Sequence, residues 1–166
     1  MNIHLTLMTK ELCRRYHKGF QYDPDMFTDG SHIPTYNYSA EHSDAHWQRQ
    51  RDLNRVHLAV MLGDKPIGDL VLKNIDSIKK CCILGIHLQN DSCKNLGYGT
   101  EAEILALEYA FTKMGMDTVY ADALLKNTRS RHVLEKVGFH ETHRDAIFAY
   151  YICEKSYLRR TERGCK

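Results

Sequence analysis

The sequence lacks a long apolar segment and a strong excess of either charge. No apolar run approaches the roughly 20 residues that a helix needs to cross a bilayer. The segment from Met1 to Thr6 has no basic stretch followed by an apolar one, so we expect no signal peptide. The net charge of +2 is too near balance for a typical nucleic-acid-binding protein. We therefore expect no membrane and no nucleic acid among the partners of this protein.

The sequence also lacks the cysteine and histidine spacings of disulfide frameworks and metal sites. The six cysteines include no Cys-x-x-Cys pair, so we expect reduced thiols in a cytoplasmic protein. Ten histidines are scattered along the chain, and only His42 and His46 have the i, i+4 spacing of one helix face. With Asp44 and Trp47 they either complete a metal site or line a surface helix. We favour the surface helix and expect no metal.

The length and composition indicate one globular domain. A chain of 166 residues can bury a hydrophobic core, and 43% hydrophobic and 27% charged residues are ordinary for such a domain. We expect residues 1–158 to form this single domain and the basic residues 159–166 to form a disordered tail.

Periodicity and capping residues predict the order of helices and strands. Residues 3–7 alternate as in a half-buried strand. Thr9 and Ser39 are expected to cap helices that reach about Lys18 and Leu53. The later elements are expected as strands at 56–62, 66–73 and 82–88, a helix from Thr100 to about Met114, a strand at 118–123, a helix at 128–137, and strands near 140–144 and 146–154. The order β-α-α-β-β-β-α-β-α-β-β describes an α/β protein, with a mixed sheet and helices on both faces.

A turn with two glycines separates the apolar run at 82–88 from the long apolar helix. It consists of Lys94, Asn95, Leu96, Gly97, Tyr98, Gly99 and Thr100. Glycines let the backbone bend so that several N–H groups point at one spot, and a helix N-terminus adds unpaired donors and the positive end of its dipole. Such a turn can bind a phosphate or pyrophosphate group, although two glycines alone are more typical of an ordinary strand-to-helix turn. It is no Walker loop, because no Gly-Lys-Ser/Thr follows.

A second motif runs from Asn127 to Phe139, after the strand at 118–123. Asn127 or Thr128 is expected to start a short helix. Gly138 supplies the left-handed residue just past the end of that helix.

Together the two motifs resemble those of the GNAT superfamily of acetyl-CoA-dependent N-acetyltransferases. Residues 94–99 are similar to its Arg/Gln-x-x-Gly-x-Gly/Ala pyrophosphate loop, and residues 127–139 to its Asn-x-x-Ser…Glu-Lys-x-Gly-Phe segment. The residues of both motifs are most similar to those of the RimJ/RimL-like branch. The resemblance covers roughly residues 55–155. It implies a GNAT-like fold, with residues 1–158 as a single N-acetyltransferase domain.

The resemblance also implies the reaction and the cofactor-binding residues. The protein would move an acetyl group from acetyl-CoA, its co-substrate, to a primary amine of a small molecule or peptide N-terminus through a ternary complex, without a metal. The strand at 82–88 would hold the pantetheine arm and polarise the carbonyl. Asn127 would bond that arm, and Ser130 would lie near the sulfur. The implied cofactor-binding residues are Ile86, His87, Leu88, Lys94, Asn95, Leu96, Gly97, Tyr98, Gly99, Thr100, Asn127 and Ser130.

The resemblance leaves the catalytic acid open. Many GNAT enzymes have a tyrosine where this chain has Leu134, which has no proton to give. Ser130, an ordered water, or Tyr150 or Tyr151 from the last strand would take the role, or no dedicated acid exists.

The catalytic base is equally open. Asp122, His87 and Asp69 are candidates, and each is also an ordinary strand residue. A glutamate expected for RimL-type enzymes is replaced by Phe148 or Ala149. We predict Ser130, Asp122 and Tyr150 as catalytic residues.

The acceptor amine is expected to contact the first two helices and their connection. Phe27, Tyr36, Tyr38 and Trp47 would form an aromatic wall, although aromatic side chains also pack helices onto sheets. The nearby aspartates, Asp23, Asp25 and Asp29, would attract a cationic amine or serve as turn residues.

Two further interpretations remain at this stage. The missing tyrosine and glutamate are also compatible with a catalytically weak or inactive GNAT-fold sensor that binds acyl-CoA. The near-neutral charge and the cysteine spacing argue against a metal- or nucleic-acid-binding module. An exposed final strand near 150–154 would let two copies pair as a homodimer.

Overall fold

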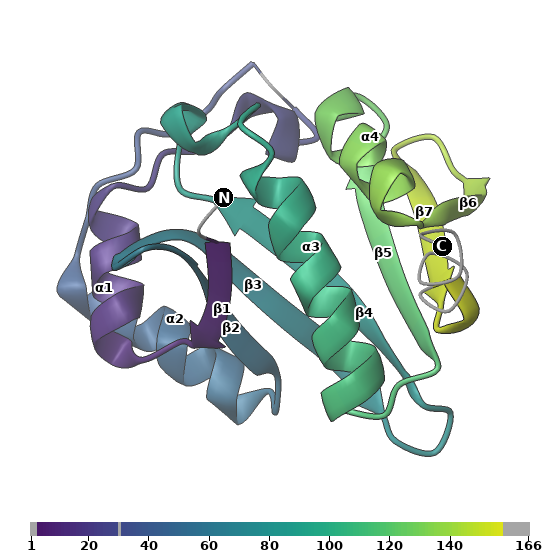
Figure 1. Ribbon diagram of the computed structural model, residues 1–166. Helices are drawn as coiled ribbons and strands as arrows, with labels where there is room; N and C mark the ends of the chain where they lie inside the picture. The colour runs from purple at the N-terminus through teal and green to yellow at the C-terminus, as the bar shows by residue number, and fades with distance from the viewer. Residues whose placement is uncertain (1–2, 30, 158–166) are drawn as a thin grey trace.

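Seven strands form one mixed sheet in the order β1-β2-β3-β4-β5-β7-β6 (Figure 1). The computed structural model describes residues 3–29 and 31–157, so the tail predicted at 159–166 lies outside the described residues. Neighbouring strands are antiparallel except β4 and β5, which are parallel. The strands are β1 (Ile3–Leu7), β2 (Val56–Leu62), β3 (Lys65–Asp76), β4 (Cys81–Leu88), β5 (Thr118–Leu124), β6 (His140–Arg144) and β7 (Phe148–Glu154). The predicted α/β fold and the order of its elements are confirmed.

Four α-helices cover this sheet: α1 (Lys10–Lys18), α2 (Ala40–Asp52), α3 (Tyr98–Glu108) and α4 (Thr128–Val137). Their N-caps act as predicted, because Thr9 Oγ1 accepts a hydrogen bond from Leu12 N and Ser39 Oγ accepts one from His42 N. None of the described helices has both the length and the apolar character needed to span a membrane.

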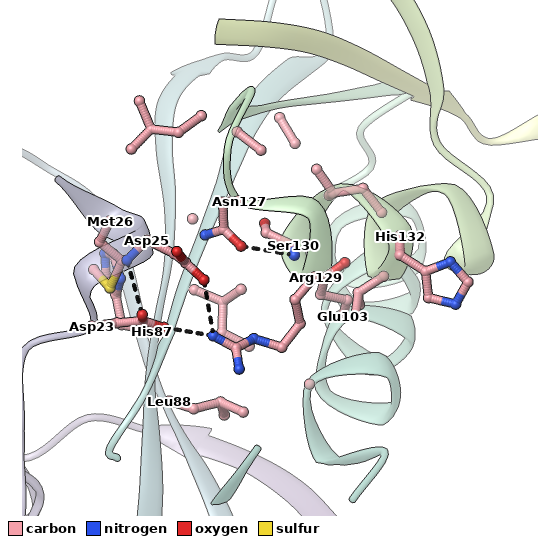
Figure 2. A pocket seen from close by; sticks show the side chains of 18 of the residues that line it. Asp23, Asp25, Met26, His87, Leu88, Glu103, Asn127, Arg129, Ser130 and His132 are labelled. Atoms are coloured by element: carbon pink, nitrogen blue, oxygen red, sulfur yellow. Dashed lines mark hydrogen bonds and ion pairs between the residues drawn. The ribbon is translucent and has the colours of Figure 1, made fainter. Parts of the chain in front are cut away.

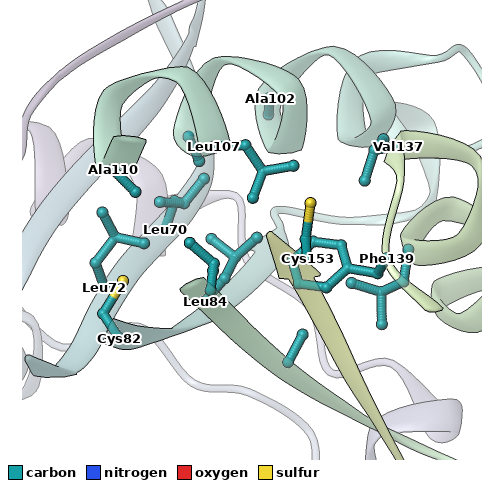
Figure 3. Packing of buried hydrophobic residues seen from close by; sticks show 14 of the residues in the cluster. Leu70, Leu72, Cys82, Leu84, Ala102, Leu107, Ala110, Val137, Phe139 and Cys153 are labelled. Atoms are coloured by element: carbon teal, nitrogen blue, oxygen red, sulfur yellow. The ribbon is translucent and has the colours of Figure 1, made fainter. Parts of the chain in front are cut away.

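Two helices cover each face of the sheet, as the alternating side chains of β2 show. Leu58 and Val60 belong to the large core cluster with residues of α3 and α4, whereas Ala59 and Met61 pack with Cys13 and Trp47 of α1 and α2. Figure 3 shows α3 lying over the buried side chains of the sheet. One face therefore carries α3 and α4, and the opposite face carries α1 and α2.

The long helix differs from its prediction at both ends. It begins at Tyr98 rather than Thr100, because Gly97 takes a left-handed conformation, with φ of 82°, and becomes the N-cap. The α-helix ends at Glu108, and a π-helical turn, Tyr109–Lys113, follows. The start of α3 therefore lies nearer to the glycine turn than the periodicity indicates.

The expected pairing of residues 150–154 with a second copy is wrong. β7 lies between β5 and β6 and forms ladders with both, so it is not an exposed edge strand of the sheet. The error arises because the last strand of the sequence inserts beside β5, while β6 occupies the edge of the sheet (Figure 1).

β4 and β5 pair only over a short stretch. Their ladder joins residues 81–83 to residues 118–120, while β4 continues to Leu88 and β5 to Leu124 without further pairing between them. The two strands therefore diverge, as expected, and leave a slot in the middle of the sheet.

Candidate functional site

A pocket of about 850 Å³ occupies the slot where β4 and β5 diverge. Its walls come from both strands, the β4–α3 turn, the start of α4, and a short 3-10 turn, η1 (Pro24–Met26), that lies between α1 and α2 in the chain. Figure 2 shows η1 on one side of this pocket and α4 on the other. A pocket of this size can hold a ligand of cofactor dimensions.

The turn before α3 has the geometry of an anion site. Asn95 and Gly97 both have positive φ, 59° and 82°, which brings the chain round to the helix start. Gly97 is the N-cap and has no side chain to accept the first N–H groups of α3. Gly97, Gly99 and Thr100 all line the pocket. The free donors and the helix dipole together favour a phosphate or diphosphate here.

Lys94 reaches carboxylates rather than open solvent. Its Nζ lies 2.7 Å from Asp23 Oδ2 and 2.7 Å from Asp91 Oδ1, and only 8% of its side chain is exposed. Arg129 NH2 lies 2.9 Å from the same Asp23 oxygen. Burial alone would raise the pKa of Asp23, but hydrogen bonds from Lys94 and the Asp25 N–H lower it below its usual value. The Asp23 carboxylate thus pairs with two cations, Lys94 and Arg129, that line the pocket.

Asn127 and Ser130 lie together at the start of α4. Asn127 Oδ1 accepts a hydrogen bond from Ser130 N at 3.0 Å, which caps the helix, and both residues line the pocket (Figure 2). Among the described residues the Asn127 amide nitrogen has no hydrogen-bond partner. Leu134 also lines the pocket, where its side chain offers no hydroxyl.

The three candidates for the base are separated by the structure. His87 and Asp122 line the pocket, whereas Asp69 does not. The neighbours of His87 on β4 and of Asp122 on β5 belong to the core beneath α3, so strand alternation places both side chains towards the α1 and α2 face. The His87 side chain is exposed within the pocket, and desolvation by the pocket walls lowers the pKa of its imidazole.

Neither tyrosine of β7 reaches the pocket. Tyr150 donates its hydroxyl to Asp145 Oδ2 at 2.9 Å, and its ring stacks on His143 with the centroids 4.5 Å apart. Tyr151 is buried, and its hydroxyl accepts a hydrogen bond from Arg131 Nε at 3.1 Å. Of the predicted catalytic residues, Ser130 and Asp122 lie at the pocket and Tyr150 does not.

The predicted aromatic wall is divided among different places. Phe27 and Tyr36 both contact Tyr22, with ring centroids 5.4 and 5.6 Å away. Trp47 lies apart from them, with its Nε1 donating to the Met8 carbonyl at 2.8 Å. Tyr38 lies beside the ammonium of Lys18. None of the four predicted wall residues lines the pocket.

The predicted cofactor residues are mostly gathered at the pocket. Leu96 and Tyr98 are the exceptions, because Leu96 is exposed and Tyr98 packs against the core cluster. Those that line the pocket are Ile86, His87, Leu88, Lys94, Asn95, Gly97, Gly99, Thr100, Asn127 and Ser130.

Sequence reasoning missed Glu103 of α3, whose side chain lies at the pocket near α4 (Figure 2). The residue is 3% exposed, and burial raises the pKa of its carboxyl to about 8. Its Oε2 is buried without a hydrogen-bond partner among the described residues. The sequence offered one signal for this residue. Glu103 lies one helical turn after Thr100, on the face of the helix that also carries Ala102 and Ala106.

Comparisons with known proteins agree with this geometry. A family model described as an acetyltransferase (GNAT) domain matches residues 3–140. No curated protein sequence matches the chain.

Several solved structures share the fold. A spermidine N-acetyltransferase from Vibrio cholerae, in complex with CoA and spermine, is 18% identical, with a TM-score of 0.76 over 94% of this chain and 98% of that chain. The enzyme AAC(6')-Ib, in complex with ribostamycin and CoA, is 16% identical, with a TM-score of 0.79 over 97% of this chain and 98% of that chain. A chimera of the Vibrio cholerae spermidine N-acetyltransferase and hSSAT is 18% identical, with a TM-score of 0.76 over 96% of this chain and 99% of that chain.

Proposed function

This chain belongs to the GNAT acetyltransferase family, whose domain model matches residues 3–140, and on that premise we propose that it transfers an acetyl group from acetyl-CoA to a primary amine. The slot between β4 and β5 carries the proposal. Its lining runs from the anion site at the start of α3 to His87 and Asp122, whose side chains project towards the opposite face of the sheet. Two substrates entering from opposite faces would meet in this slot.

The residues that line the slot fit coenzyme A. The N–H groups after Gly97 would bind the diphosphate. β4 pairs with β3 on one side only beyond Ile83, so its other edge offers backbone groups to the amides of a pantetheine arm. The free amide nitrogen of Asn127 would donate to the same arm.

The reaction requires an unprotonated amine and a proton for the leaving thiolate. His87, whose pKa is lowered, and Asp122 both line the pocket, where either would accept the proton that leaves the amine, directly or through water. Ser130 is the predicted hydroxyl at the pocket that would donate to the sulfur. Alignment of two bound reactants can itself supply roughly 7–11 kcal/mol of the barrier reduction.

The acceptor is proposed to be a primary amine of a small molecule or a peptide N-terminus. Two of the solved structures are complexes with spermine or ribostamycin, and each of these ligands carries several amino groups, which supports testing polyamines and aminoglycosides first. The residues of the 94–99 and 127–139 motifs support the RimJ/RimL-like branch. Peptide N-termini are therefore the second group of acceptors to test. We propose the cytoplasm as the site of action, in keeping with the five free cysteines of the described residues.

The first experiment is thermal unfolding of the protein with and without acetyl-CoA. A ligand at a hundred times its Kd stabilises the folded state by about 2.7 kcal/mol. A clear rise in Tm would support the cofactor, and thiol release would then be measured with polyamines, aminoglycosides and peptides.

The two outcomes of the amine panel separate the enzyme from the sensor. Release of CoA that depends on one amine class and is lost in Ser130→Ala or Asp122→Asn would support catalysis. Binding of acetyl-CoA without release of CoA for every amine would favour the acyl-CoA sensor. Leu134, which cannot donate a proton, is compatible with that alternative. No rise in Tm at millimolar acetyl-CoA would contradict the proposed function altogether.

A further inference from the structure

A second cluster of reactive side chains lies between the sheet and helices α1 and α2. It brings together His17 of α1, His46 of α2, His57 of β2 and Asp69 of β3. His46 Nε2 lies 2.9 Å from Asp69 Oδ2, and His57 Nε2 lies 3.0 Å from Asp69 Oδ1. None of these four residues lines the cofactor pocket, so acetyl transfer as proposed above does not use them.

We propose that His17, His46 and Asp69 form a binding site for one zinc-like divalent metal ion. An imidazole nitrogen from each histidine and a carboxylate oxygen of Asp69 lie within 4.8 Å of one another. Tetrahedral zinc, with bonds of about 2.0–2.2 Å, places its ligand atoms about 3.3–3.5 Å apart. Shifts on the order of 1 Å, which side-chain rotation can provide, would bring these three atoms to that spacing.

The nature of the ligands selects the metal. Two imidazoles and one carboxylate suit zinc and its neighbours among the transition metals, whereas calcium and magnesium prefer oxygen ligands throughout. Three protein ligands leave a fourth position open. His46 provides a route to that position, because 36% of its side chain is exposed, while the side chain of Asp69 is only 6% exposed.

Residues around the cluster hold the proposed ligands in the required orientation. His57 bonds Asp69 Oδ1 and leaves Oδ2 for the metal. Cys13 Sγ donates to the Ser43 carbonyl at 3.4 Å and lies 3.6 Å from His17 Nδ1, from which it would accept a hydrogen bond. In the tautomer with the proton on Nδ1, Nε2 carries the lone pair that a metal needs. Hydrogen-bonded histidine and carboxylate ligands of this kind are usual in metal sites.

A bound metal ion would displace the proton shared by His46 and Asp69 and would link α1, α2 and β3. His46 Nε2 and Asp69 Oδ2 share a hydrogen bond at 2.9 Å, and binding of a metal ion would release the proton between them. The bound ion would tie α1 and α2 to β3, beside His87, which is directly opposite Asp69 in the β3–β4 ladder. Its expected effect is therefore to stabilise the helices that flank the acceptor side of the slot.

The test uses the full chain, freed of metal by dialysis against EDTA and then titrated with zinc by calorimetry. We expect one equivalent of tight binding and a higher Tm. His46→Ala should weaken binding by at least about 100-fold, because ligand loss exceeds the 10–100-fold cost of losing a supporting hydrogen bond. His46 is partly exposed, so this variant should fold, and its circular dichroism spectrum would verify that.

His42→Ala is the matched control, because His42 is exposed one helical turn before His46 on α2. Zinc affinity unchanged in His42→Ala and lost in His46→Ala would support the site, as would the absorption bands of tetrahedral cobalt in the wild-type protein alone. No stoichiometric binding by the wild type, or equal affinity in His46→Ala, would overturn it. Equal loss in both variants would identify a surface pair on α2 and would also overturn it. None of these readouts depends on acetyl transfer.

Discussion

The carboxylate of Asp23 extends from the loop after α1 to the ammonium of Lys94, with Asp23 Oδ2 and Lys94 Nζ 2.7 Å apart. The same oxygen lies 2.9 Å from Arg129 NH2 on α4, so one carboxylate joins three parts of the pocket wall (Figure 2). Lys94 follows the 3-10 turn η2 (Asp91–Cys93) and begins the turn proposed to bind a diphosphate. Asp23 is therefore paired with a positive charge that would attract the diphosphate. The loop carboxylate and the cofactor should therefore compete for the same cations.

The change Asp23→Asn tests this competition. Loss of the negative charge removes one carboxylate partner from both Lys94 and Arg129, so the Kd for coenzyme A should fall several-fold. The unliganded protein should lose about 1–3 kcal/mol of stability, because buried Lys94 keeps only Asp91 as a charged partner. Calorimetry with coenzyme A and denaturant unfolding would measure the two effects.

Asp25→Asn is the control for that experiment, since Asp25 lies 3.7 Å from Arg129 and 47% of its side chain is exposed. It should change neither quantity by more than a few tenths of a kcal/mol, as is usual for an exposed ion pair. Weaker binding of coenzyme A by Asp23→Asn would show instead that the ion pair is needed to shape the pocket.

Gly99→Ala should separate ligand binding from folding. A Cβ at Gly99 would meet only Leu88 Cδ1, at an ordinary 3.7 Å, so the fold should tolerate the methyl group without a change in Tm. The methyl would enter the pocket beside the first N–H groups of α3, and the Kd for coenzyme A should rise about tenfold, which corresponds to about 1.4 kcal/mol. Calorimetry and a melting curve on the same sample would test both expectations.

Gly97→Val should behave differently. Gly97 has a left-handed φ of 82°, which costs a branched residue about 1–2 kcal/mol or more. The variant should lose stability as well as coenzyme A binding. Unchanged affinity in both glycine variants would rule out the turn as the diphosphate site.

Asn127→Asp should distinguish the two roles of Asn127. Aspartate caps helices as well as asparagine does, so the bond to Ser130 N and the Tm should be retained. The amide nitrogen proposed to donate to the pantetheine arm is replaced by an oxygen that cannot donate. We expect a higher KM for acetyl-CoA, measured by thiol release, with folding unchanged. A KM equal to that of the wild type would leave Asn127 as a helix cap alone.

The parts of the structure that local signals determine were predictable from the sequence. The bounds of α4 match the prediction, because its cap at Asn127 and its end at Gly138 are both set by neighbouring residues. The turn at Gly97 and Gly99 was recognised for the same reason. These two motifs were also enough to identify the family.

Contacts between distant residues were not predictable in this way. Asp23 and Lys94 are 71 positions apart, and the cluster at His17, His46 and Asp69 joins three separate elements. No local pattern shows which strands become neighbours, so the position of β7 inside the sheet was also missed. The two exceptions within the glycine turn have different causes, because the Leu96 side chain is exposed and the Tyr98 side chain packs against the core cluster.

Glu103 gives the protein a pH dependence of known sign. Burial raises the pKa of its carboxyl from 4.5 to about 8. Between these two values the unfolded chain has released the proton and the folded protein retains it. The contribution of Glu103 to the free energy of unfolding is therefore fully present below about pH 4.5 and is lost as the pH rises towards 8. At a higher pH an ionised carboxylate would also stand in the pocket that is proposed to bind a polyanion.

Glu103→Gln removes this titration while keeping the shape of the side chain. Relative to the wild type, the variant should gain on the order of a few kcal/mol in free energy of unfolding between pH 5 and pH 8, measured with urea at each pH. The affinity for coenzyme A should fall above pH 8 in the wild type and remain level in the variant. Glu108→Gln, at an exposed position of the same helix, should follow the wild type in both measurements. If the free energy of unfolding of the wild type and of Glu103→Gln depends on pH in the same way, the prediction is wrong. Glu103 would then ionise in the folded protein at its ordinary pKa, because water reaches its carboxyl.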